Sequence, residues 1–120
     1  MTYILAILAG LFGAAGVAAG AAAAHASADP RLATLSQMLM VHAAAILALL
    51  GLGRGSPAAG VFVWAAGLMA GGILLFASDL AARHFLGDRL FPLAAPVGGS
   101  LTIASWLLAA GAAGLAFARR

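Results

Sequence analysis

Long stretches without a charged side chain divide this chain of 120 residues. No Asp, Glu, Lys or Arg occurs from Met1 to Ala28, and the further uncharged stretches are Leu32–Gly53, Gly55–Ser78 and Leu90–Ala118. Each is at least about 20 residues long, which lets a helix cross a hydrocarbon layer of roughly 30 Å. Their apolarity is continuous instead of alternating, and they are rich in Ala, Leu and Gly, which disfavours β-strands. The sequence therefore predicts four transmembrane helices.

Composition excludes a soluble globular domain. Charged residues make up 8% of the chain and hydrophobic residues 65%, against about 25% and 45–50% in soluble domains. The six basic residues are all Arg and lie singly or in pairs between apolar stretches. This pattern is typical of membrane-interface anchors and not of a nucleic-acid-binding surface. Because the chain has no Cys, disulfides and thiolate metal sites are excluded.

The expected fold is a single all-α membrane domain, an antiparallel bundle of four transmembrane helices. The helices are expected over about residues 3–26, 30–52, 57–83 and 96–118. The pairs Asp29-Pro30 and Ser56-Pro57 each place a capping side chain before a proline at the first helical position. Pro96 marks the start of the last helix. The first helix is expected to be retained and not cleaved as a signal, because no basic residue precedes it.

Small residues indicate where the helices pack. Lipid tails are as apolar as Leu, so helices associate in a bilayer through close backbone contact at small residues. Two glycine pairs have the four-residue spacing typical of such contacts, and two adjacent glycines lie in the last helix. The candidate packing residues are Gly16, Gly20, Gly67, Gly71, Gly98 and Gly99. They would form faces within the bundle or between two copies, unless Gly is simply common in these helices.

Few polar side chains could carry chemistry, and they form one candidate cluster: His25, His42, Asp79, Arg83 and His84. Asp79 precedes Arg83 by four residues, the spacing at which an acid and a base pair on one helix. The alternative is that Asp79 binds a proton or a cation. His42 lies about 18 Å along its helix and is expected to hydrogen-bond a neighbouring helix. Ser36, in the polar first turns of the same helix, is expected to lie among the headgroups.

Neither an active site nor a cofactor is expected. His25, His42 and His84 are weak candidate metal ligands, but no pair of them has ligand spacing on one helix. No Ser is placed with a His and an acid in a recognisable triad, and there is no Gly-rich phosphate loop. The protein is therefore expected to bind no cofactor and to catalyse no reaction.

Several motifs along the chain carry a resemblance to a known family. They are a Gly/Ala-rich helix ending in His (Gly16–His25), His42-Ala43 followed by apolar residues, the stretch Leu74–Asp79, and Pro96, Gly98 and Gly99 followed by Trp106-Leu107. The chain resembles the domain of unknown function 423 family of small bacterial membrane proteins, which is similar to eukaryotic transmembrane protein 256. Many members have Tyr-Gln just before the second His, where this chain has Met40-Val41, so any role of that pair is missing here. The resemblance implies four helices and an inner-membrane location, and no activity.

Three functions remain open from the sequence. The favoured one is a structural or interaction bundle that binds membrane lipid, a membrane-protein partner or a second copy of itself. A transporter or channel for a small solute or ion is the alternative, but it needs a hydrated polar path, and polar side chains within the helices are few. A His-based metal-binding protein is the second alternative.

Orientation follows from the arginines near the helix ends. With four crossings, Arg54, Arg119 and Arg120 share one side with both termini, and Arg31, Arg83 and Arg89 lie on the other. The counts are equal. The amino terminus adds positive charge to the first side, and a pairing of Arg83 with Asp79 weakens the second. The termini are therefore expected in the cytoplasm.

Overall fold

The computed structural model describes residues 1–120, and the chain forms four helices. They are α1 (Thr2–His25), α2 (Pro30–Gly53), α3 (Ala59–Phe85) and α4 (Ala94–Ala118). At 24 to 27 residues, they are about 36 to 40 Å long, and all four are long and apolar enough to cross a membrane. The prediction of an all-α chain with four such helices is confirmed.

The helix ends lie within two residues of the predicted ones, and two of them, Pro30 and Ala118, coincide with the prediction. Asp29 caps α2 as predicted, because its side chain accepts a hydrogen bond from the Arg31 N–H over 3.0 Å. The Ser56 hydroxyl instead accepts from the Ala58 N–H, which forms a turn before the helix, so α3 begins at Ala59 and not at Pro57. Helix α4 begins two residues before Pro96, after Leu93 in the left-handed region (φ 67°).

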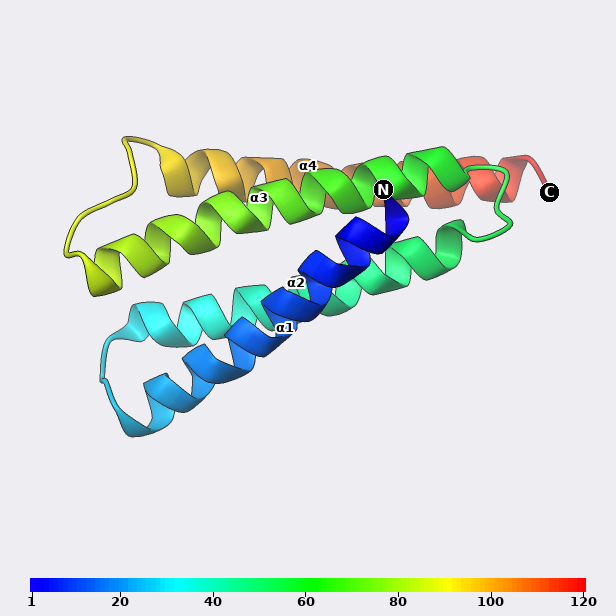
Figure 1. The fold of residues 1–120 in the computed structure, drawn as a ribbon. Helices are drawn as coiled ribbons and strands as arrows, with labels where there is room; N and C mark the ends of the chain where they lie inside the picture. Colours follow the sequence, from blue (N-terminus) through cyan, green and yellow to red (C-terminus); the bar gives the residue numbers. More distant parts are fainter.

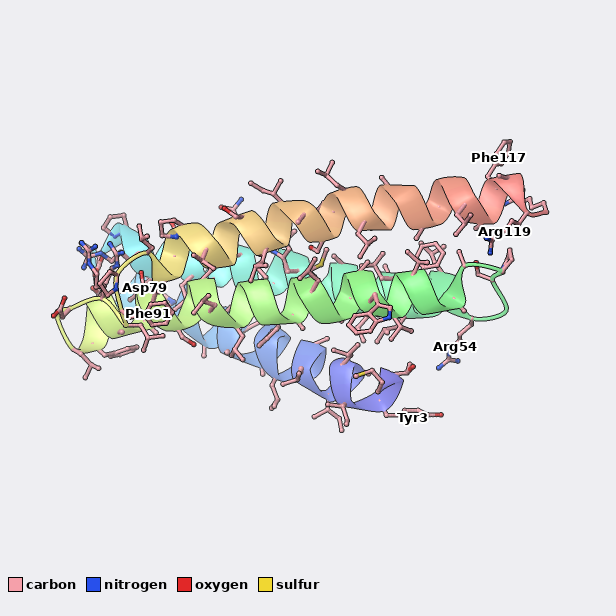
Figure 2. The ribbon with its side chains drawn as sticks, turned by 90° about the horizontal axis from the view of Figure 1, so that it is seen from above. Tyr3, Arg54, Asp79, Phe91, Phe117 and Arg119 are labelled. Carbon is pink, nitrogen blue, oxygen red and sulfur yellow. The ribbon has the colours of Figure 1, made fainter.

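The chain reverses direction along the long axis at every connection (Figure 1). The α1–α2 turn (residues 26–29) and the α3–α4 connection (residues 86–93) lie at one end, called here the loop end. The α2–α3 turn and the C-terminus lie at the opposite, terminal end. Figure 2 places Tyr3, Arg54 and Arg119 toward the terminal end, and Asp79 and Phe91 at the loop end.

Each helix packs mainly on its neighbours in the sequence. The large interfaces join α1 to α2, α2 to α3, and α3 to α4, whereas α1 barely contacts α3. In Figure 1, α1 lies inclined across α2. The molecule measures 50 × 28 × 20 Å, and its largest fully buried apolar side chains, Ile46, Met69 and Ile73, come from α2 and α3. Helix α1 is therefore attached mostly through α2, which leaves its side toward α3 open.

The α3–α4 interface brings two helix backbones into contact at Gly72 and Gly98. A Cβ atom added to Gly98 would lie 2.6 Å from the Phe76 nitrogen and 2.7 Å from the Gly72 carbonyl oxygen. A Cβ on Gly72 would lie 2.9 Å from the Gly98 oxygen. These are backbone atoms that cannot move aside. Gly99 is less constrained, since its nearest neighbour would be the Phe76 ring at 3.9 Å.

The α1–α2 interface uses glycine differently. Ser36 of α2 is buried between Gly16 and Gly20 of α1, and its hydroxyl donates a hydrogen bond of 2.7 Å to the Gly16 carbonyl oxygen. A Cβ on Gly20 would lie 2.8 Å from the Ser36 hydroxyl, and one on Gly16 would lie 2.6 Å from the Met40 side chain. The expectation that Ser36 lies among headgroups was wrong, because an acceptor on α1 draws this hydroxyl into the interface.

Gly67 and Gly71 do not pack against another helix of the chain. A Cβ added at either position meets no atom within 4 Å. Their spacing is typical of a packing face, but the glycine that meets α4 is Gly72. The helix period therefore turns Gly67 and Gly71 away from the α3–α4 interface.

This difference gives a paired test of the packing. Gly98→Ala should lower the free energy of unfolding by about 1–3 kcal/mol, the usual cost of overpacking, because the added methyl group meets backbone. Gly71→Ala should not lower it, since the methyl group enters open space. Unfolding in mixed detergent micelles, followed by circular dichroism, measures both. Equal effects of the two variants would contradict the assignment of the α3–α4 contact.

A candidate polar site at the loop end

Charged side chains gather at the loop end from three elements: the start of α2, the end of α3 and the α3–α4 connection. They are Asp29, Arg31, Asp79, Arg83, His84, Asp88 and Arg89. Figure 2 shows the side-chain nitrogen atoms crowded together beside Asp79. Because the chain reverses direction at every connection, these elements lie at one end (Figure 1).

Asp79 is the most enclosed of these groups, with no exposed surface. Arg83 Nε donates to Asp79 Oδ2 over 2.8 Å, and the Leu90 backbone N–H donates to Oδ1 over 2.8 Å. A buried carboxylate costs several kcal/mol unless charge and hydrogen bonds compensate it, and here both oxygens are engaged. The side chain of Arg83 remains 34% exposed. Asp79 thus attaches the α3–α4 connection to the last turns of α3.

Asp29 makes the corresponding link between α2 and α3. Its Oδ1 accepts from the Arg31 N–H, and its Oδ2 lies 2.7 Å from His84 Nδ1, which donates to the carboxylate. The hydrogen bond from His84, and after it the one from the Arg31 backbone, hold the pKa of Asp29 below its ordinary value of 3.8. Asp29 therefore stays ionised and joins residues that are 55 positions apart.

Three arginines surround a small polar cavity beside these links. Its volume is about 150 Å³, and its lining contains no apolar residue: Arg31, Arg83, Gly87, Asp88 and Arg89. Arg31 Nη1 reaches the Arg83 carbonyl oxygen at 3.4 Å and Asp29 Oδ2 at 3.6 Å. Arginine N–H groups that converge in this way can hold a small oxyanion.

His42 lies away from this end, in the middle of α2. Its Nδ1 is 2.7 Å from the Met38 carbonyl oxygen, which only accepts, so Nδ1 carries the hydrogen. Its Nε2 then accepts from Trp106 Nε1 of α4 over 3.2 Å. The ring is buried, and both nitrogens are used. The hydrogen bond to a neighbouring helix is present as expected, and it leaves His42 no lone pair for a metal.

The candidate cluster of five residues therefore separates into three parts. Asp79, Arg83 and His84 meet at the loop end, whereas His42 binds α4 within the bundle. His25 is exposed at the end of α1 and makes no side-chain hydrogen bond. Nowhere do three His, Asp or Glu side chains come together as metal ligands. His25 and His42 could meet only if the first turns of α2 folded back along the interface, but α2 is helical from Pro30.

Sequence reasoning did not identify three of the contacts that organise this structure. They are the Asp29–His84 pair, the Ser36–Gly16 hydrogen bond and the Trp106–His42 hydrogen bond. The loop-end location of Asp29 and His84 could have indicated the first. Nothing in a single sequence sets the rotation of α2 and α4 that makes the other two.

A second feature is an apolar cleft between α1 and α3. Toward the loop end it holds a cavity of about 430 Å³, lined by α1, α2 and α3, in which Ser78 is the one polar residue. Toward the terminal end it holds a cavity of about 740 Å³ between α1 and α3, lined by residues that include Ile4 and Trp64. Both cavities arise because α1 inclines away from α3, and the second includes Gly67.

The Asp79 link gives a direct test of the loop end. Asp79→Asn removes the charge that Arg83 binds but keeps an oxygen that can accept from Leu90, so the free energy of unfolding should fall by about 1.5–3 kcal/mol, the usual worth of a charge-assisted hydrogen bond. Asp88→Asn is the control, because Asp88 is exposed and bonds only the next backbone N–H. Chemical unfolding in detergent measures both, and an unchanged Asp79→Asn variant would mean that the carboxylate does not hold the connection.

Comparison with known proteins gives a family but no activity. No curated protein and no solved structure matches the chain. A family model described as "Protein of unknown function (DUF423)" matches residues 19–99, a range that contains Ser36, His42, Asp79 and all of the loop end. Because this match covers more than half of the chain, the protein belongs to the DUF423 family.

Proposed function

We propose that this protein is an antiparallel four-helix bundle of the bacterial inner membrane whose role is structural, and that it binds phospholipid acyl chains in the α1–α3 cleft. The observation that carries this proposal is the cleft itself. It is apolar along nearly its whole lining and opens between helices that are long and apolar enough to span a membrane. Concave apolar sites of several hundred Å³ are the usual binding sites for apolar ligands. In a bilayer, the nearest apolar ligand is an acyl chain.

The polar side chains inside the bundle support a structural role over transport. A transporter presents buried polar groups to a hydrated path. Here each buried polar side chain has a partner within the chain, and none is left unpaired. The residues are Ser36, His42, Asp79, Thr102 and Ser105. We accordingly propose lipid as the partner, with no cofactor, no nucleic acid and no catalytic role.

Filling the cleft should displace lipid. Ala18 lines the cavity toward the loop end, and Ala14 is exposed on α1 outside both cavities. We expect Ala18→Trp to lower the number of phosphatidylcholine molecules retained by the detergent-solubilised protein, and Ala14→Trp to leave that number unchanged. Native mass spectrometry counts the bound lipids, and circular dichroism checks that both variants are folded.

Two results would overturn this function. One is equal lipid retention by both variants and the wild type, which would mean that the cleft holds no lipid. The other is ion or proton flux through vesicles that contain the purified protein and not through empty vesicles, which would favour the transporter alternative.

We further propose that both termini lie in the cytoplasm. Arg54, Arg119 and Arg120 lie on the terminal side together with the amino group, whereas Arg83 on the other side is paired with Asp79. Since Lys and Arg near the helix ends set orientation, a neutralised Arg83 leaves the terminal side as the more positive one.

Cysteine labelling tests this orientation, because the chain has no Cys of its own. In spheroplasts, Leu86→Cys at the loop end should react with a membrane-impermeant maleimide. Thr2→Cys and Ala118→Cys should react only after the membrane is permeabilised. The reverse pattern would place the termini outside. Labelling of Thr2→Cys and Ala118→Cys from opposite sides would contradict four crossings.

A further inference from the structure

We propose that the three-arginine cavity at the loop end binds the phosphate group of an anionic phospholipid. The site consists of Arg31, Arg83 and Arg89, with Gly87 and Asp88 completing the lining. This inference rests on the proposed lipid-binding bundle and adds to it a headgroup site distinct from the acyl-chain cleft. The cleft lies on the α1 side of α3, and no residue lines both it and the arginine cavity.

The three arginines keep unpaired N–H donors. Arg83 uses only Nε, in its bond to Asp79, so both of its terminal nitrogens remain available. Arg89 makes no side-chain hydrogen bond or ion pair, and Arg31 uses only Nη1, at 3.4 and 3.6 Å. A guanidinium group carries five N–H donors in a planar fork that matches phosphate oxygens. The cavity is thus lined by more donors than the chain satisfies.

The oxygens of the two neighbouring carboxylates that lie outside the lining are already engaged in hydrogen bonds. Both oxygens of Asp79 accept bonds from Arg83 and Leu90, and both oxygens of Asp29 accept from Arg31 and His84. Asp88 alone lines the cavity, so three positive side chains face one negative side chain. Asp79 and Asp29 offset the charges of Arg83 and Arg31 from outside the lining, so an anion would be held mainly by the free N–H donors and by the charge of Arg89.

The size and the position of the cavity also suit a phosphate group. A volume of 150 Å³ is about five times that of a water molecule in the liquid, which suits one phosphate group and not an acyl chain. The cavity lies where membrane-spanning helices α2 and α3 end, at the level expected for headgroups. Basic pockets between helix ends are typical sites for anionic lipid headgroups. The ligand we infer is therefore a phospholipid with net negative charge, such as phosphatidylglycerol.

The test compares two lipids and two pairs of substitutions. The double variant Arg31→Gln/Arg89→Gln removes two guanidinium groups from the cavity without breaking the Asp79–Arg83 pair. The double variant Arg54→Gln/Arg119→Gln makes the same change of charge at the terminal end and serves as the control. Native mass spectrometry of the detergent-solubilised protein, titrated with phosphatidylglycerol or phosphatidylcholine, gives the apparent affinities.

We expect the wild type and the control to prefer phosphatidylglycerol. The cavity variant should bind it about 25-fold more weakly, from about fivefold for each arginine at a membrane surface. The single variant Arg89→Gln should lose about fivefold and retain the wild-type thermal midpoint, since its side chain makes no contact to lose. Phosphatidylcholine binding should be the same in all of these proteins.

The outcomes separate this inference from the proposed function. Equal affinity for both lipids in the wild type, or equal loss in the control variant, would overturn the headgroup site while leaving the cleft intact. Binding of inorganic phosphate with no preference for phosphatidylglycerol would assign the cavity to a free anion and also overturn the inference. Competition of phosphate with phosphatidylglycerol in the wild type, lost in the cavity variant, would support it. Loss of phosphatidylcholine binding in the Ala18→Trp variant would support lipid binding in the cleft and would leave the headgroup site unaffected, because Ala18 does not line the arginine cavity.

Discussion

Close backbone contact at glycine is the constraint on which the rest of this structure depends. In a bilayer, burying Leu against Leu gains little over burying it against lipid, so helices must gain by approaching closely. The Gly72–Gly98 contact brings α3 and α4 together backbone to backbone, and Gly16 and Gly20 make room for Ser36 between α1 and α2. The first contact sets how α4 lies on α3, and with it the position of Thr102, whose side chain and backbone lie against Gly72. The Ser36–Gly16 hydrogen bond between α1 and α2 depends directly on this close approach.

Polar groups in this protein serve to connect segments. Asp79 links α3 to the connection that follows it, Asp29 links α2 to α3, and His42 links α2 to α4. Hydrogen bonds between membrane helices contribute modestly each, but each of these fixes two segments whose apolar surfaces would otherwise slide. The buried polar residues therefore account for a defined arrangement of helices more than for its stability.

The sequence predicts the helices well and the contacts between them partly. Charge-free stretches and the Asp29-Pro30 cap locate the helices to within two residues, because length and capping are local properties. The pairing of Asp79 with Arg83 is also local, since it lies within one helix. The rotation of each helix about its own axis, in contrast, is set by contacts with residues far away in the sequence. It decides that Gly72 and not Gly71 meets α4, that Ser36 faces α1, and that His42 meets Trp106, so spacing alone could not give these contacts.

The order of contacts along the chain has a consequence for how the molecule assembles. Each large interface joins a helix to the next one in the sequence, and no large interface joins α1 to α4. A chain with such local contacts has a low contact order, and low contact order is associated with fast folding. Each helix after α1 follows, in the sequence, a helix with which it shares a large interface. The same sequential connectivity gives α1 and α4 one large interface each, so detaching either of them breaks one large interface, whereas detaching α2 or α3 breaks two.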